Sequence, residues 1–120
     1  MANQIVWCDI PVLDLDRAVR FYSAVLGQTV KKQEFPGATV GILPHHEGEV
    51  GGCLTVSGEE RASDKGILIY LNANGRLDDA LAAVLVHGGQ IVQEKHPIGP
   101  FGFRAIILDS EGNRIALHSD

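Results

Sequence analysis

The sequence has few of the residues that mark several large classes of protein. Of its 120 residues only two are cysteine and one is tryptophan. No apolar run approaches the roughly 18 residues of a membrane span, so we expect no membrane as a partner. No basic segment followed by an apolar one opens the chain, so we expect no export and a cytoplasmic location. We find no phosphate-binding loop, dinucleotide fingerprint or nucleophile elbow.

Positive charge is also scarce. Ten lysines and arginines stand against 15 aspartates and glutamates, which gives a formal net charge of −5, and only Lys31 and Lys32 are adjacent. Nucleic acid needs a cationic face, so we do not expect it as a partner. The two cysteines, Cys8 and Cys53, do not have the spacing of a metal motif, and without an export signal we expect them to be reduced, buried thiols.

The best-defined stretch of the chain begins at Val12 and ends at Gly27. Asp14 is an N-cap that can accept hydrogen bonds from the first turn, and Gly27 supplies the left-handed residue that ends a helix. These signals predict a helix over residues 15–26. Its apolar residues recur at i, i+3, i+4, i+7 and i+8 and form one stripe: Ala18, Phe21, Tyr22, Val25 and Leu26.

Segments rich in strand-forming residues surround this helix, and a second helix follows later. The pair Gly51-Gly52 indicates either a bulge or a close approach of the backbone. We expect strands at residues 4–11, 29–35, 38–43, 50–56, 66–72, 90–94, 101–108 and 114–118, and the second helix at residues 77–87.

The order of the elements occurs twice. The helices superpose at a shift of 62 residues, the distance from Gly27 to Gly89, and Asp16 then falls on Asp78. An internal repeat is a strong signal for a fold. We therefore expect one α+β domain over residues 1–120, made of module 1 (1–58) and module 2 (64–120). Each module is a βαβββ unit, and the two form paired half-barrels with a concave cavity between them.

The repeat, the segment Ile10–Tyr22 with Val25-Leu26-Gly27, and the closing segment Leu108–Leu117 resemble the vicinal oxygen chelate superfamily. This group includes glyoxalase I, bleomycin-resistance proteins, fosfomycin-resistance enzymes and extradiol dioxygenases. The resemblance covers essentially the whole chain. It implies the glyoxalase/bleomycin-resistance fold and a homodimer. It also implies a cavity in which the enzymes of the family hold one divalent metal ion.

The family's metal-ligand positions carry poor ligands here. Indole, methyl and aliphatic groups have no lone pair suited to a divalent cation, and a single thiol does not make a site. We therefore expect neither a metal nor a cofactor. The positions fall on Trp7, on Cys53, on one of Ile67, Leu68 and Ile69, and on Ala116.

A histidine-rich segment elsewhere in the chain looks like a metal cluster at first sight. His45 and His46 are followed by Glu47 and Glu49. Adjacent residues of an extended chain point to opposite sides, so we expect a solvated loop here.

Other side chains are candidates for chemistry in the cavity. Strand alternation places Asp9 on the face of Trp7, and His118 on the face of Ala116. As a pair, Asp9 and His118 would act as a general base or a substrate anchor, whereas the structural alternative leaves each bonded separately or solvated. Phe35 is a further candidate, and for each phenylalanine an ordinary core position is the alternative. The predicted ligand-binding residues are Trp7, Cys53, Phe101, Phe103, Arg114 and Ala116.

Three functional hypotheses follow. The first is a protein that binds a small molecule in the cavity without a metal, similar to bleomycin-resistance proteins. The alternative is an enzyme of the same fold, acting as a lyase, isomerase or dioxygenase-like protein through Asp9 and His118 by an altered mechanism. The third is a structural or regulatory dimer module without a ligand. The sequence leaves open whether the protein is an enzyme.

Overall fold

The computed structural model describes residues 3–56 and 62–120 and contains two four-stranded sheets and two helices. The α+β class and the twofold repeat of the βαβββ unit are confirmed. Module 1 consists of β1 (Trp7–Pro11), α1 (Leu15–Leu26), β2 (Lys31–Phe35), β3 (Ala38–Ile42) and β4 (Gly51–Thr55). Module 2 consists of β5 (Ile69–Asn72), α2 (Leu77–Val86), β6 (Gln90–Pro97), the 3₁₀ turn η1 (Gly99–Phe101), β7 (Phe103–Leu108) and β8 (Arg114–Ser119). Residues 57–61, where the predicted module 1 ends, lie outside the described residues.

Both sheets have the same topology. The strand order is β1-β4-β3-β2 in sheet 1 and β5-β8-β7-β6 in sheet 2. In each sheet the first strand of the module pairs in parallel with its last strand, and the other pairs are antiparallel. The chain that connects these two parallel strands includes the helix, because a parallel pair needs a long crossover connection.

Helix α1 begins and ends where its capping residues predict. The carboxylate of Asp14 accepts a hydrogen bond of 3.0 Å from the backbone N–H of Arg17, and Gly27 ends the helix with φ of 70°. A Cβ atom at Gly27 would lie 2.9 Å from the guanidinium carbon of Arg76, which donates to the carbonyl of Val25. The left-handed φ favours glycine here, and Arg76 ties the end of α1 to module 2.

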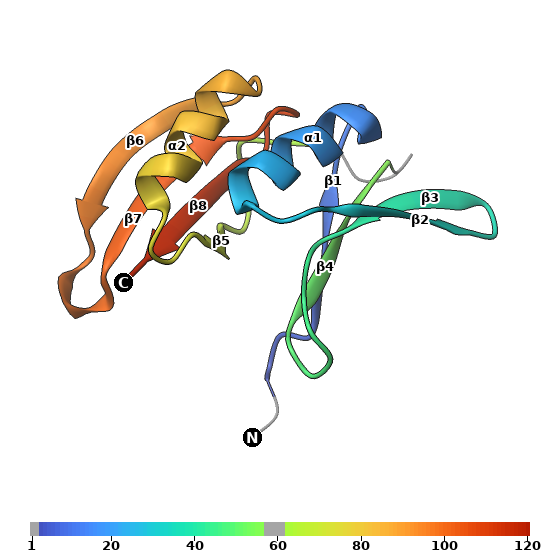
Figure 1. Ribbon diagram of the computed structural model, residues 1–120, viewed down its shortest axis with the longest axis horizontal. Coiled ribbons are helices and arrows are strands. Elements are labelled where there is room, and N and C mark those ends of the chain that lie inside the picture. The colour runs from blue at the N-terminus through green and yellow to red at the C-terminus, as the bar shows by residue number, and fades with distance from the viewer. Residues whose placement is uncertain (1–2, 57–61) are drawn as a thin grey trace.

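The two modules share one hydrophobic core. Helices α1 and α2 pack against each other, and the modules meet mainly through them (Figure 1). One continuous cluster contains the buried stripes of both helices and the helix-facing residues of both sheets. Its largest members are Tyr22, Phe21, Ile10, Leu54, Ile107 and Leu117.

The opposite face of each sheet, which we call its open face, points away from this core. Four buried apolar residues lie outside the core cluster: Val40 and Cys53 in sheet 1, and Ile106 and Ala116 in sheet 2. Strand register places these residues on the open faces. The cavity expected between the half-barrels is therefore not enclosed by the two open faces of a single chain, because both helices and the core lie on the other side of each sheet.

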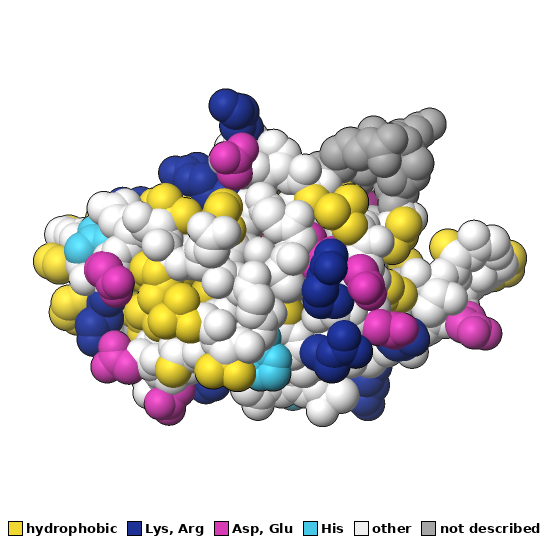
Figure 2. All heavy atoms as spheres, turned by 90° about the horizontal axis from the view of Figure 1, so that it is seen from above, with side chains coloured by type: hydrophobic (Ala, Val, Ile, Leu, Met, Phe, Trp, Pro, Cys, Tyr) yellow, Lys and Arg dark blue, Asp and Glu magenta, His cyan; other side chains and the backbone are white. Residues whose placement is uncertain are grey.

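The upper side of the molecule mixes both signs of charge (Figure 2). Figure 2, which shows the side that is uppermost in Figure 1, has lysines and arginines interspersed with aspartates and glutamates. Within residues 3–56 and 62–120, no helix has the length and apolar character needed to cross a bilayer.

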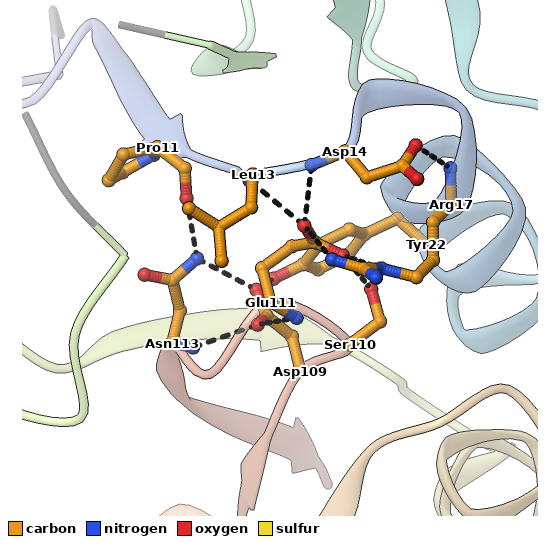
Figure 3. A network of polar contacts seen from close by, with 9 residues as sticks. All are labelled: Pro11, Leu13, Asp14, Arg17, Tyr22, Asp109, Ser110, Glu111 and Asn113. Atoms are coloured by element: carbon orange, nitrogen blue, oxygen red, sulfur yellow. Dashed lines mark hydrogen bonds and ion pairs between the residues drawn. The ribbon is translucent and has the colours of Figure 1, made fainter. Parts of the chain in front are cut away.

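A buried carboxylate, Glu111, joins module 2 to the start of α1 (Figure 3). It lies in the turn between β7 and β8. One of its oxygens accepts the backbone N–H groups of Leu13 and Asp14 at 2.9 and 2.8 Å. Arg17 donates to both carboxylate oxygens, at 2.7 and 2.9 Å. The pair is bidentate, the strong geometry for an arginine and a carboxylate.

Asp109 and Asn113 extend this network beside Glu111. Asp109 accepts hydrogen bonds from the hydroxyl of Tyr22 and from the amide of Asn113, and Asn113 also donates to the carbonyl of Pro11 at 2.7 Å. All three side chains of the turn are nearly inaccessible to solvent, and their polar atoms have partners. We call these contacts between the β7–β8 turn and the β1–α1 segment the turn network.

The network shifts the ionisation of its members. Burial on its own would raise the pKa of Glu111, but hydrogen bonds from Arg17, Asp14, Ser110 and Leu13 outweigh it and lower that pKa to about 2. Burial, followed by the charge of Asp109, raises the pKa of Tyr22 well above its ordinary value. At neutral pH the turn network therefore contains an ionised Glu111 and a neutral Tyr22.

We predict that Glu111→Gln lowers the free energy of unfolding by about 2–3 kcal/mol, because the Arg17 charge loses its partner. The folded-state pKa of about 2 lies below the ordinary value of 4.5, so protonation favours the unfolded chain. Wild-type stability is then complete above pH 4.5 and decreases as the pH falls towards 2. Urea unfolding across this range measures both effects.

Glu34→Gln is the matched control, since Glu34 is exposed in β2 and the change in charge is the same. It leaves stability within about 0.5 kcal/mol of wild type. Equal losses in both variants, or a pH dependence that Glu111→Gln does not reduce, would contradict the assignment.

Candidate functional site

The open face of sheet 1 carries a hydrogen-bonded group built around Asp9. The indole N–H of Trp7 donates to Oδ1 of Asp9 at 3.0 Å, and the thiol of Cys53 donates to the same oxygen at 3.3 Å. Asp9 pairs with Cys53 between β1 and β4, which places the three side chains on one face. Trp7 is 43% exposed, so its ring is fixed at one edge while much of its surface remains accessible.

Gly51 makes room for this ring. A Cβ atom there would lie 2.6 Å from the Trp7 ring and 3.0 Å from His45. The pairing of β4 with β1 and β3 runs without a register shift, so the close backbone approach, and not the bulge, accounts for the glycine. His45 packs edge-on against Trp7, with 5.7 Å between ring centroids, and supports the indole from the side.

Cys53 is a poor metal ligand in this position. Burial raises the pKa of its thiol, and Asp9 raises it further through their hydrogen bond and its charge, to about 11, although Trp7 acts in the opposite direction. Metal binding requires the thiolate, which is a minor species at neutral pH. Cys8 points to the core side of the sheet, and both thiols are free.

The other family ligand positions do not complete a metal site. One of these positions falls on Ile67, Leu68 or Ile69. Ile69 packs against the core, so alternation along the chain places Leu68 on the open side. Trp7, Leu68 and Ala116 provide no ligand atom. The residues at these positions therefore do not fit a divalent ion.

The histidine-rich loop does not supply a metal site either. Nδ1 of His45 bonds to the carbonyl of Leu43, and Glu49 accepts the backbone N–H of His46. Among the residues described, no three His, Cys, Asp or Glu side chains are placed to hold a metal ion.

The open face of sheet 2 contains three predicted site residues from β8. Arg114, Ala116 and His118 alternate along this strand, with Ala116 fully buried and the other two partly exposed. Nε2 of His118 donates to the carbonyl of Phe101 at 2.6 Å. Phe101, in η1, is 72% exposed beside this histidine, and both line a shallow hollow of about 560 Å³.

The structure does not bring Asp9 and His118 together within one chain. No hydrogen bond or ion pair joins these two described residues, and each has partners on its own side of the molecule. They belong to different sheets whose open faces both point away from the shared core.

Phe103 does not share the open face. Phe103 pairs with Ser119, the residue after His118 in β8. Successive residues of a strand point to opposite faces, so Phe103 lies on the side of α2. There it lines a hollow of about 370 Å³ with Leu77, Asp78 and Lys95, whose ammonium group lies 6.0 Å from the ring centroid. Phe35 is 48% exposed at the end of the β2–β3 hairpin.

Sequence reasoning missed a polar group in the middle of the sheet 2 open face. Arg104 of β7 donates to the hydroxyl of Tyr70 at 2.7 Å and contacts Nε2 of His96 through two of its nitrogens. Arg104 pairs with His118, so it has the same facing as that predicted residue. No signal in the sequence alone reveals this facing, because it depends on the pairing of β7 with β8.

Comparison with known families decides the identity of the fold. The model of the Glyoxalase/Bleomycin resistance protein/Dioxygenase superfamily matches residues 4–117. The chain belongs to this superfamily. The match covers both modules, so the resemblance inferred from the opening and closing segments is confirmed.

Relatives of this superfamily member are distant. It is 28% identical over 112 residues to "Putative glyoxylase CFP32" of Mycobacterium bovis, and the match covers 90% of this chain and 41% of that protein. The chain thus spans about two-fifths of the length of that relative.

Solved structures agree in fold. A glyoxalase/bleomycin resistance protein from Albidiferax ferrireducens T118 superposes with a TM-score of 0.76 at 17% identity, covering 98% of this chain and 99% of that one. The fosfomycin resistance protein FosX from Listeria monocytogenes gives 0.69 at 13% identity, covering 100% and 93%. At these identities the likeness concerns the fold alone.

We predict that Asp9→Asn makes Cys53 more reactive. Replacing the carboxylate removes the two effects of Asp9 that raise the pKa of this thiol, so the thiolate fraction at pH 8 increases about tenfold. The rate of reaction with a disulfide reagent measures this fraction. A Cys8→Ala background leaves Cys53 as the sole cysteine.

Asp16→Asn is the control, because Asp16 is an exposed carboxylate of α1 that pairs with Lys32. It leaves the rate unchanged. A Cys53 that reacts equally fast with and without Asp9 would disprove the contact between them.

Proposed function

We propose that this superfamily member binds a small, partly aromatic molecule on its open faces without a metal ion. The observation that carries the proposal is the environment of Trp7. An indole ring stands at a ligand position of the family's metal site, fixed by Asp9 and accommodated by Gly51, with 43% of its surface accessible. A held, accessible aromatic ring favours stacking with a planar ligand.

The chemistry of the neighbouring groups supports binding without metal. Cys53, Leu68 and Ala116 offer at most one ligand atom, and the thiol of Cys53 is protonated at neutral pH. Both hydrogen bonds that Asp9 accepts from the described residues use Oδ1, so its second carboxylate oxygen can serve a ligand beside the indole. The site can therefore combine stacking with a hydrogen bond to a donor group of the ligand.

A second copy of the chain would complete the cavity, and we propose a homodimer for this reason. Each open face presents accessible aromatic surface, Trp7 in sheet 1 and Tyr70 at 47% exposure in sheet 2. Their charges are complementary, since Asp9 lies on one face and Arg104 and Arg114 on the other. Packing sheet 1 of one copy over sheet 2 of its partner would enclose a ligand between these groups.

The enzymatic alternative depends on the same arrangement. Asp9 and His118 have separate partners within a chain, so a carboxylate–imidazole pair would form only between two copies. No contact among the described residues favours a reaction over binding, and we retain Asp9 and His118 as a prediction for an enzyme with an altered mechanism.

Trp7, the one tryptophan of the chain, gives a direct experimental signal. We predict that an uncharged planar compound such as quinoxaline shifts the indole N–H resonance of Trp7 saturably, with the same affinity in the presence of EDTA. Ligand-observed NMR then measures Trp7→Leu, which we expect to weaken binding about tenfold because the stacking surface is lost.

Phe103→Leu is the matched control, because Phe103 is an aromatic residue of similar exposure (42%) that lies on the side of α2 and not on an open face. It retains wild-type binding. Light scattering on the same samples is expected to give twice the chain mass of 12.9 kDa. Binding that disappears with EDTA, or that survives Trp7→Leu unchanged, would refute the proposal.

A further inference from the structure

The guanidinium of Arg104 is fixed at the centre of the sheet 2 open face. Its Nη1 donates to the Tyr70 hydroxyl at 2.7 Å, and its Nε and Nη2 lie 3.2 and 3.0 Å from Nε2 of His96. Tyr70 comes from β5 and His96 from β6, on opposite sides of β7 and β8 in the strand order. Because three strands converge on it, the guanidinium has little freedom to move.

Neither partner neutralises its charge. Nδ1 of His96 faces the carbonyl of Glu94 at 2.8 Å and must carry the proton, so Nε2 accepts from Arg104 and the ring is neutral. Tyr70 accepts through its hydroxyl oxygen. In the described part of the chain no carboxylate forms an ion pair with Arg104. Among residues 3–56 and 62–120, one hydrogen on each terminal nitrogen has no protein partner, which leaves donors suited to an oxyanion.

Ala116 makes room for this arrangement. Tyr70 pairs with Ala116 and Arg104 pairs with His118, so the contact between Tyr70 and Arg104 spans β8 at this point. Ala116 is fully buried although it lies on the open face. The resemblance places a glutamate metal ligand at this position. Here a methyl group replaces it, and a fixed organic cation lies beside it.

The strand neighbours of Arg104 on this face carry no negative charge. Strand register places His118, Ile106 and Asn72 nearest to it, and none of these is acidic. Arg114 has the same facing but lies opposite Leu108, four residues further along β7.

We propose that Arg104, held by Tyr70 and His96, binds an oxyanion group, a carboxylate or a phosphoryl group, of the small molecule taken up on the open faces. This inference rests on the proposed function and defines the ligand class as an anionic, partly aromatic compound. The fixed guanidinium takes the place that a divalent cation has in the family's metal-dependent members. Tyr70 and His96 act as positioning residues for it.

The test uses acetate and methylphosphonate as probes, with uncharged acetamide for comparison. Titration of the full-length protein is followed through the side-chain Nε–H resonance of Arg104. We expect both anions to shift this resonance saturably and to compete with each other, whereas acetamide does not. Ligand-observed NMR then measures Arg104→Gln, which is expected to weaken binding at least about tenfold. Methylphosphonate binding without acetate binding would restrict the class to phosphoryl compounds.

A variant with the same loss of charge away from the open faces provides the control. Arg20→Gln changes an exposed arginine on α1. We expect it to bind the probes within about twofold of wild type. Tyr70→Phe and His96→Gln keep the charge of Arg104 but release its guanidinium, so they weaken binding less than Arg104→Gln does. Equal weakening by Arg20→Gln and Arg104→Gln would overturn the site, because the attraction would then be unspecific.

The outcomes separate this inference from the function on which it rests. If quinoxaline shifts Trp7 and neither anion shifts Arg104, the oxyanion site is refuted while the proposed function stands. If the anions bind at Arg104 but no planar compound reaches Trp7, the proposed aromatic site fails instead.

Discussion

Burial of the ionised Glu111 is the constraint on which the rest of the structure depends. A charge away from water must be fully paired, and Arg17 together with the backbone of Leu13 and Asp14 provides that pairing. These partners lie about 95 residues earlier in the chain. The first helix of module 1 therefore cannot leave the β7–β8 turn of module 2 without exposing an unpaired charge on one side and orphaned backbone donors on the other.

This constraint determines which surfaces remain for function. With the turn network closed, α1 and α2 pack together and the helix-facing sides of both sheets merge into one core. The opposite faces are left open, one with Trp7 and Asp9 and the other with Tyr70 and Arg104. Asp9 lies on one face and Arg104 on the other, so the proposed site would hold a ligand between opposite charges. The same asymmetry favours pairing of unlike faces when two copies meet.

Local structure could be predicted from the sequence because its determinants are local. Asp14, the apolar stripe and Gly27 specify helix α1 to the residue. The facing of Trp7 and Asp9 follows from alternation alone. The position of Phe103 could not be obtained in this way, because its face depends on pairing with Ser119 in a different strand. For the same reason Arg104 was not singled out, although it pairs with His118.

The relation between the modules was the least predictable feature. The segments Ile10–Tyr22 and Leu108–Leu117 were recognised separately, and nothing in either indicates that Glu111 contacts Leu13 and Asp14. A single sequence carries no information on such a contact between distant residues. The expected pairing of Asp9 with His118 assumed that the two open faces meet within one chain. The shared core keeps these faces apart.

Amide hydrogen exchange at Leu13 and Asp14 tests the role of Glu111 most directly. Both residues are exposed and precede the helix, so without their bonds to the carboxylate their N–H groups would exchange rapidly. We predict that they exchange as slowly as the core amides of both modules, and that Glu111→Gln accelerates them together with the first turn of α1. Rapid exchange at Leu13 and Asp14 in the wild-type protein would contradict the account.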